Sequence, residues 1–135
     1  LQNFVSTNGR NPYDSLIKAN DGKFYGTTQF GGTSNGGVLF SYEIGVGITK
    51  LIDFIGTNGN QPYGSLFQAS DGKLYGMTYQ GGTSDYGTIF RTSNAGESWS
   101  LVPCDTNIWL YDVYFRDINH GWIVGGEWYS DESIS

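Results

Sequence analysis

Short runs in which apolar and polar residues alternate recur along the chain, separated by clusters of glycine, asparagine and aspartate. Alternation with a period of two is typical of β-strands that bury one face, and the intervening clusters favour tight turns. No segment shows the apolar spacing of an amphipathic helix. We therefore predict an all-β fold with strands at residues 15–19, 23–28, 37–43, 48–55, 65–69, 73–78, 87–92, 98–102, 110–116 and 121–126.

The strand pattern repeats with a period of fifty residues. Residues 1–40 align with residues 51–90 without a gap, and 22 of those 40 positions are identical. Both repeats carry an Asp-Gly-Lys turn between their first two strands, where Asp-Gly tolerates the positive φ angles of a tight hairpin. A period of this length indicates stacked supersecondary units. Four antiparallel strands in each unit form the blade of a β-propeller.

The repeat predicts one propeller segment, residues 1–135, of about two and a half blades. Residues 1–5 match residues 51–55 and are expected to form the outer strand of a preceding blade. Residues 15–55 make the first blade, 65–102 the second and 110–135 part of a third. Because propellers close with about four to eight blades, we expect either a piece of a longer propeller or a ring completed by copies of the chain through strand addition. The incomplete third blade favours the longer chain.

The charge composition argues against two classes of partner. Thirteen acidic against seven basic side chains give a net charge of -6, and without a Lys/Arg cluster neither nucleic acid nor an anionic membrane surface is an expected partner. No run approaches the roughly 18 apolar residues of a membrane helix. The sequence begins without Met or a secretory leader, so we expect a processed product or an excised fragment. The single Cys104 is interpreted as a small buried apolar residue.

Two resemblances follow from particular segments. Residues 65–90, SLFQASDGKLYGMTYQGGTSDYGTIF, resemble the unit of GloVer-type tandem repeats of bacterial secreted proteins, and this resemblance covers residues 1–92. The segment TSNAGESW is similar to the Asp-box (BNR) pattern S/T-x-D-x-G-x-T/S-W, and LYDVYF with GWIVGG resembles relatives of the photosystem II stability/assembly factor. Both imply a propeller, and the first implies an extracellular or cell-surface location in a bacterium.

The Asp-box resemblance implies a structural role. Its residues here are Thr92, Asn94, Gly96, Ser98 and Trp99. We expect the Asn94 side chain to hydrogen-bond backbone amides of the turn and Trp99 to pack between blades. Sialidases carry such boxes away from their catalytic centre, and their chemistry needs an arginine cluster.

Catalysis, a metal and a cofactor are not expected. The arginines are too few for a sialidase-like cluster: Arg10, Arg91 and Arg116. A glycosidase needs a pair of carboxylates around the scissile bond. The carboxylates here lie in turns or at strand borders, or stand alone on the surface: Asp21, Asp71, Asp112, Asp117 and Asp14. The Asp-Gly-Lys turns offer one carboxylate followed by a lysine, a poor calcium site.

Propeller topology predicts a loop-rich face. Residues 7–13 and 29–35 are expected on one rim, as are 57–63 and 79–86, with Tyr, Asn and Thr suited to sugar or peptide contacts. We interpret the recurring Tyr13 and Tyr63 as packing between blades. Residues that differ between repeats are the candidate ligand contacts: Arg10, Asp14, Phe30, Gln80, Asp85 and Tyr86.

These observations predict a non-catalytic extracellular binding or scaffold module, with a protein or a glycan on the loop-rich face. Its other partners are further blades of a longer chain or copies in a homo-oligomer. One alternative is the propeller portion of a carbohydrate-active enzyme whose catalytic residues lie outside this segment. Another is an assembly factor that binds a protein complex.

Overall fold

The computed structural model describes residues 3–94, 98–102, 108–117 and 120–126, and every regular element among them is a β-strand. The all-β prediction is therefore confirmed. In chain order the strands are β1 (Ile17–Lys18), β2 (Phe24–Thr28), β3 (Val38–Glu43), β4 (Gly47–Asp53), β5 (Asn60–Pro62), β6 (Phe67–Gln68), β7 (Leu74–Gln80), β8 (Thr88–Asn94), β9 (Ser98–Val102), β10 (Trp109–Asp117) and β11 (His120–Gly126). Within the described residues no helix is long and apolar enough to cross a membrane.

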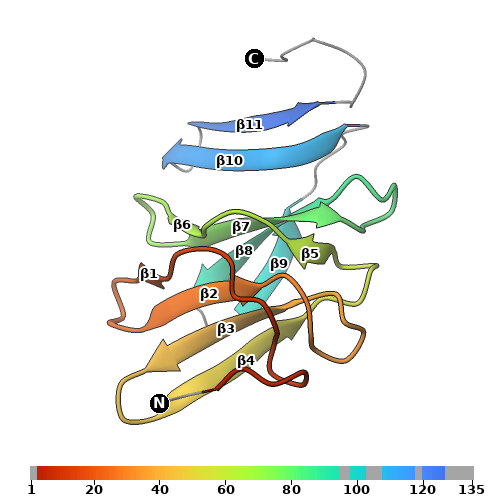
Figure 1. The fold of residues 1–135 in the computed structure, drawn as a ribbon. Helices are drawn as coiled ribbons and strands as arrows, with labels where there is room; N and C mark the ends of the chain where they lie inside the picture. Colours follow the sequence, from red (N-terminus) through yellow and green to blue (C-terminus); the bar gives the residue numbers. More distant parts are fainter. Residues whose placement is uncertain (1–2, 95–97, 103–107, 118–119, 127–135) are drawn as a thin grey trace.

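The strands form three antiparallel sheets that follow one another from the bottom to the top of Figure 1. The first sheet has the order β1-β2-β3-β4. In the second, β7 pairs with β8, β8 pairs with β9, and both short strands β5 and β6 pair with β7. The third is the hairpin β10-β11. Each fifty-residue repeat therefore forms one sheet of consecutive antiparallel strands.

The first strand of each repeat is broken into two pieces. In the second repeat β5 and β6 pair with opposite ends of β7, and in the first repeat an isolated bridge between Arg10 and Phe30 takes the place of β5. Asn11 and Gln61 adopt positive φ angles of 56° and 53°, a backbone conformation that L-residues rarely hold. The strands predicted at residues 15–19 and 65–69 are shorter in the structure, as the two-residue β1 and β6. Residues 3–5 are not in a strand, and the assignment of residues 1–5 to a preceding blade stays a prediction.

One apolar core joins the first two sheets. It includes Tyr25 and Leu39 from the first sheet and Leu74 and Phe90 from the second, together with Phe54 directly after β4. The Phe54 ring lies 5.2 Å from the Phe90 ring. A smaller core joins the second sheet to the third through Met77, Ile89 and Leu110. Each seam between sheets is thus closed by buried apolar side chains.

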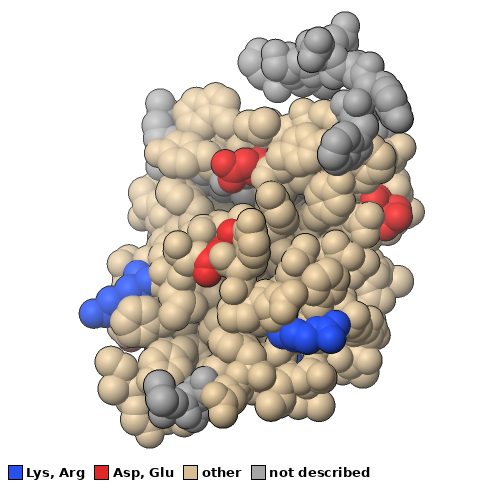
Figure 2. All heavy atoms as spheres, viewed as in Figure 1, with Lys and Arg blue, Asp and Glu red and all other residues tan. Residues whose placement is uncertain are grey.

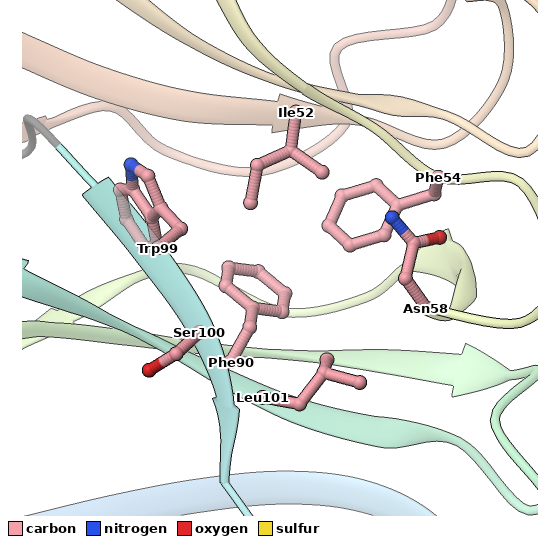
Figure 3. A pocket seen from close by; sticks show the side chains of 7 residues that line it. All are labelled: Ile52, Phe54, Asn58, Phe90, Trp99, Ser100 and Leu101. Atoms are coloured by element: carbon pink, nitrogen blue, oxygen red, sulfur yellow. The ribbon is translucent and has the colours of Figure 1, made fainter.

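The seam between the first two sheets contains a small cleft of about 160 Å³, shown in Figure 3. Its lining is largely apolar: Ile52, Phe54, Asn58, Phe90, Trp99, Ser100 and Leu101. The Trp99 ring lies 6.5 Å from Tyr25 in the first sheet and 5.7 Å from Phe90 in the second, so it lies between the sheets. The amide of Asn58 is engaged by backbone groups, through Nδ2 to the carbonyl of Asp53 and Oδ1 to the amide of Ile55. We interpret this cleft as part of the packing between repeats.

Candidate functional site

In each repeat, two loops meet on the same side of the sheet. The amide of Arg10 donates to the carbonyl of Phe30 at 2.7 Å, and the amide of Gly32 donates to the carbonyl of Ser6 at 2.7 Å. In the second repeat the amide of Gly82 donates to the carbonyl of Gly56 at 2.8 Å. Residues 7–13 therefore lie beside residues 29–35, and residues 57–63 beside residues 79–86. We call this surface the loop-rich face.

A side-chain oxygen fixes the longer loop of each repeat. Oδ1 of Asn35 accepts a hydrogen bond from the amide of Gly31 at 3.0 Å, and Oδ1 of Asp85 accepts one from Gly81 at 2.8 Å. Asn35 and Asp85 have φ angles of 57° and 61°, which asparagine and aspartate tolerate better than most residues. Asp85, a predicted ligand contact, thus has a backbone role that its counterpart Asn35 also fills.

Arg10 and Phe30, two of the predicted contacts, come together in the first repeat. The Arg10 guanidinium donates to Oδ1 of Asn35 at 3.1 Å and lies 5.8 Å from the centre of the Phe30 ring. Arg10 is exposed and Phe30 is half-buried. The pair forms a small cationic and aromatic spot at the edge of the loop-rich face.

Asp14 lies at the seam between the repeats. Partial burial raises the pKa of its carboxyl, and a hydrogen bond from the backbone of Gly64 offsets this only in part. Gly64 occupies in the second repeat the position that Asp14 holds in the first. The carboxyl therefore helps to join one repeat to the next.

Gln80 and Tyr86, the remaining predicted contacts, belong to the second repeat. Gln80 pairs with Asn60, and its carbonyl accepts the hydroxyl of Thr78 at 2.9 Å. The Tyr86 ring meets Trp109 edge-on at 6.0 Å. Tyr86 therefore packs against the third sheet, while Arg10 and Phe30 lie in the first repeat.

A groove of about 350 Å³ is lined by residues from all three sheets: Gln29, Gln61, Tyr63, Tyr79 and Tyr111. We call it the tyrosine groove. Tyr79 is its central ring, because its centre lies 6.3 Å from that of Tyr63, at an interplanar angle of 49°, and 6.4 Å from that of Tyr111, at 29°. The volume falls at the lower end of small-ligand sites, about 300–1,000 Å³. None of the five lining side chains is charged.

Each wall of the groove comes from a defined place in the fold. Gln29 directly follows β2, Gln61 lies in β5, and Tyr63 directly follows β5. Tyr79 lies near the end of β7 and Tyr111 in β10. The groove thus spans the two seams between the sheets, at the ends of strands that open onto the loop-rich face.

A family model described as the Gloeobacter/Verrucomicrobia repeat matches residues 1–108. The chain belongs to this family. The match includes both fifty-residue repeats, so the GloVer part of the predicted resemblance is confirmed. No curated protein and no solved structure matches the chain.

In this repeat protein, the position of Tyr13 differs from the sequence interpretation. Tyr13 is 75% exposed, so its interpretation as packing between blades is wrong, and its counterpart Tyr63 is 43% exposed and lines the groove. The physical reason is that Tyr13 and Tyr63 lie in the segments that precede β1 and β6, outside any strand that faces a seam between sheets. The two tyrosines recur in sequence but have different surroundings.

The tyrosine groove was not predicted as a set. Tyr79 and Gln61 differ from their counterparts Gln29 and Asn11, so the criterion that selected residues differing between repeats could have found them. Tyr111 lies in the third sheet, and its position depends on how that sheet packs against the second. Local sequence patterns do not predict this contact between sheets.

The segment that resembles an Asp box, residues 92–99, is described in part. Thr92 is fully buried, and its hydroxyl accepts the amide of Leu74 at 3.0 Å. Ser98 and Trp99 begin β9. The side chain of Asn94 and the whole of Gly96 lie outside the described residues, so the expected hydrogen bonds of Asn94 stay a prediction.

Carboxylates elsewhere in the repeat hold turns. Asp21 accepts the Lys23 amide at 3.0 Å and the Tyr25 hydroxyl at 2.7 Å. Burial, together with the hydrogen bond and charge of Asp21, raises the pKa of Tyr25. Asp71 accepts the Lys73 amide in the same way. No group of three potential metal ligands occurs among the described residues, and Figure 2 shows a face on which charged side chains are few and scattered.

Proposed function

We propose that this chain is a non-catalytic binding module whose ligand site is the tyrosine groove. The observation that carries the proposal is the convergence of Tyr63, Tyr79 and Tyr111 with two glutamine amides in one groove. Tyrosine supplies a large contact area with little loss of side-chain entropy, and its hydroxyl adds a hydrogen-bonding group. Loops on a rigid sheet scaffold are the usual location of binding residues.

The chemistry of the groove supports binding without catalysis. Hydrolysis by general acid and base catalysis needs a carboxyl or imidazole within hydrogen-bonding reach of the reacting atoms, and the five lining residues include neither. Asp21 and Asp71 are engaged by the backbone of their own turns. A structural role in their turns therefore accounts for both carboxylates.

The proposal extends to the setting of the module. We place the sheets as successive blades of a β-propeller, which four-stranded antiparallel units repeated along a chain support. The buried Thr92 and the position of Trp99 between sheets support an Asp-box role for this segment. A location outside a bacterial cell, in a secreted or cell-surface protein, is supported by the GloVer resemblance alone.

Arrays of glycans and of peptides test the binding function. We expect the wild-type protein to retain a discrete set of array ligands that Tyr63→Ala loses. Tyr13→Ala is the matched control, because Tyr13 occupies the same repeat position but lies outside the groove lining. Equal retention of every ligand by the wild type and Tyr63→Ala would show that the groove is not the binding site.

A further inference from the structure

We infer that the tyrosine groove takes a neutral oligosaccharide, an inference that rests on the binding function proposed above. The groove offers two complementary features, a row of aromatic rings and a pair of primary amides. Sugars present the matching features, since a pyranose ring has a face of C–H bonds and an edge of hydroxyl groups. The argument below takes the rings, the amides and the charge in turn.

The three rings form a continuous aromatic strip. Tyr79 is the middle ring, with Tyr63 and Tyr111 on either side at centre distances of 6.3 and 6.4 Å. The face of an aromatic ring is electron-rich and attracts polarised hydrogen atoms, and contacts of C–H groups with such faces are weak individually but add up. The planes of Tyr63 and Tyr111 make angles of 49° and 29° with the plane of Tyr79, so the rings are not coplanar. Such a strip suits the C–H faces of linked sugar units.

The glutamines supply groups that match hydroxyls. Each carboxamide of Gln29 and Gln61 carries two donors and one acceptor. A sugar hydroxyl both donates and accepts, so it can satisfy either end of an amide. The two glutamines come from neighbouring repeats, on β5 and directly after β2. They can therefore contact different hydroxyls of one ligand.

The absence of charge in the lining selects a neutral ligand. A charged group that loses its water in a groove needs an opposite charge to compensate it. No lining residue supplies one, and the net charge of -6 repels anions further. Acidic sugars and phosphate esters are therefore disfavoured.

A proline-rich peptide is the principal competitor, since such peptides dock in aromatic grooves. Proline has no backbone N–H, so it offers acceptors and few donors. The carbonyl oxygens of Gln29 and Gln61 would then be covered without a hydrogen-bond partner, which is unfavourable for each buried group. A sugar leaves no such unpaired oxygen, and the lining therefore favours the sugar.

Calorimetric titration of the whole 135-residue chain with defined probes tests the inference. The neutral probes are cellotetraose, laminaritetraose, maltotetraose and mannotetraose. The competing probes are tetragalacturonic acid and a decaproline peptide. We expect at least one neutral tetrasaccharide to bind, and Tyr63→Ala and Tyr79→Gln each to weaken it about fivefold or more, because aromatic anchor residues carry much of the free energy of binding at an interface.

Tyr79→Gln is chosen because glutamine stands at the equivalent position 29 of the first repeat and is compatible with that backbone. Tyr13→Ala is expected to bind as the wild type does. If a substitution at Tyr79 or Tyr63 lowers the thermal stability, Gln61→Ala serves as the second groove variant, and it is expected to weaken the same tetrasaccharide. Circular dichroism of each variant establishes that it is folded.

The outcomes separate the two proposals. If decaproline or tetragalacturonic acid binds with the same sensitivity to Tyr63→Ala while no neutral tetrasaccharide binds, the sugar class is wrong and the binding function stands. If a neutral tetrasaccharide binds equally well to Tyr63→Ala, Tyr79→Gln and Gln61→Ala, the sugar does not occupy the groove and the inference is wrong. If no probe binds and the arrays show no ligand that depends on Tyr63, both proposals are overturned.

Discussion

Removing the Phe54 ring should destabilise the protein far more than removing its repeat counterpart Phe4. Phe54 is 1% exposed and its ring lies 5.2 Å from that of Phe90, whereas the half-buried Phe4 lies 5.0 Å from Phe40. The two phenylalanines thus have the same partner type at nearly the same distance. They differ in what covers them, because Phe54 lies in the core shared by two sheets. The pair of variants Phe54→Ala and Phe4→Ala therefore measures what the seam between repeats contributes.

The magnitude follows from burial. Truncating a fully buried phenylalanine to alanine costs about 3–5 kcal/mol, including the cavity that remains. The half-buried Phe4 loses less apolar surface, and we expect about 1.5–2.5 kcal/mol. Domains of this size have a total unfolding free energy of about 5–15 kcal/mol. Phe54→Ala should therefore remove a large part of the stability, and Phe4→Ala a modest part.

Urea unfolding followed by circular dichroism measures both values. Because Phe54 couples one repeat to the next, its loss should also broaden the transition and lower the m-value, as expected when neighbouring repeats unfold less cooperatively. Phe4→Ala should leave the m-value unchanged. An unfolding free energy for Phe4→Ala equal to or below that of Phe54→Ala would refute the seam argument.

Three further variants test the loops and the sheet. Partial burial opposes ionisation of Asp53, but its hydrogen bonds with Lys50 and Thr33 outweigh this effect and lower its pKa. The resulting stabilisation of the folded state should be present above the ordinary pKa of about 3.9 and be lost as the pH falls below it. Asp53→Asn should cost about 1–2 kcal/mol at pH 7 and flatten this acid dependence, as measured by thermal unfolding from pH 7 to pH 2.5. Gly76→Ala should cost about 1–3 kcal/mol in urea unfolding, because a Cβ there overlaps a buried phenylalanine ring. Asn35→Asp should stabilise by about 0.2–1 kcal/mol through a charged contact with Arg10, and 1 M salt should remove most of the gain in thermal unfolding.

Most of the fold could be predicted from the sequence, because each turn and strand pattern occurs in both repeats. The Asp-Gly turns and the alternation of apolar residues define β2, β3, β7 and β8 to within a few residues. The division of the first strand of each repeat into two pieces could not be predicted. The positive φ of Gln61 within β5 could not be predicted either, because glutamine rarely adopts this conformation.

Less of the candidate site could be predicted, for a different reason. Comparison of the two repeats identifies the rim loops, but it selects individual residues and does not show which of them lie together in space. It selected Arg10 and Phe30, which the structure brings together, and it interpreted Tyr13 as packing between blades, which the exposure of that side chain contradicts. The groove requires Tyr111, whose position depends on the contact between the second and third sheets through Leu110.

Buried threonines that recur between the repeats hold the rim, and the position that follows them, which differs between the repeats, contributes two of the groove residues. Thr28 and Thr78 recur and are fully buried, and each donates its hydroxyl to the carbonyl two residues later at 2.9 Å. The residue after each threonine differs, since it is glutamine at position 29 and Tyr79 in the second repeat, and both line the groove. Because the buried threonine anchors the rim, the next side chain can differ between the repeats without disturbing the ladder. Two copies of one unit can in this way carry an asymmetric groove on a similar backbone. If the groove binds a ligand as proposed, substitutions at the position after the threonine should alter ligand preference with little effect on stability.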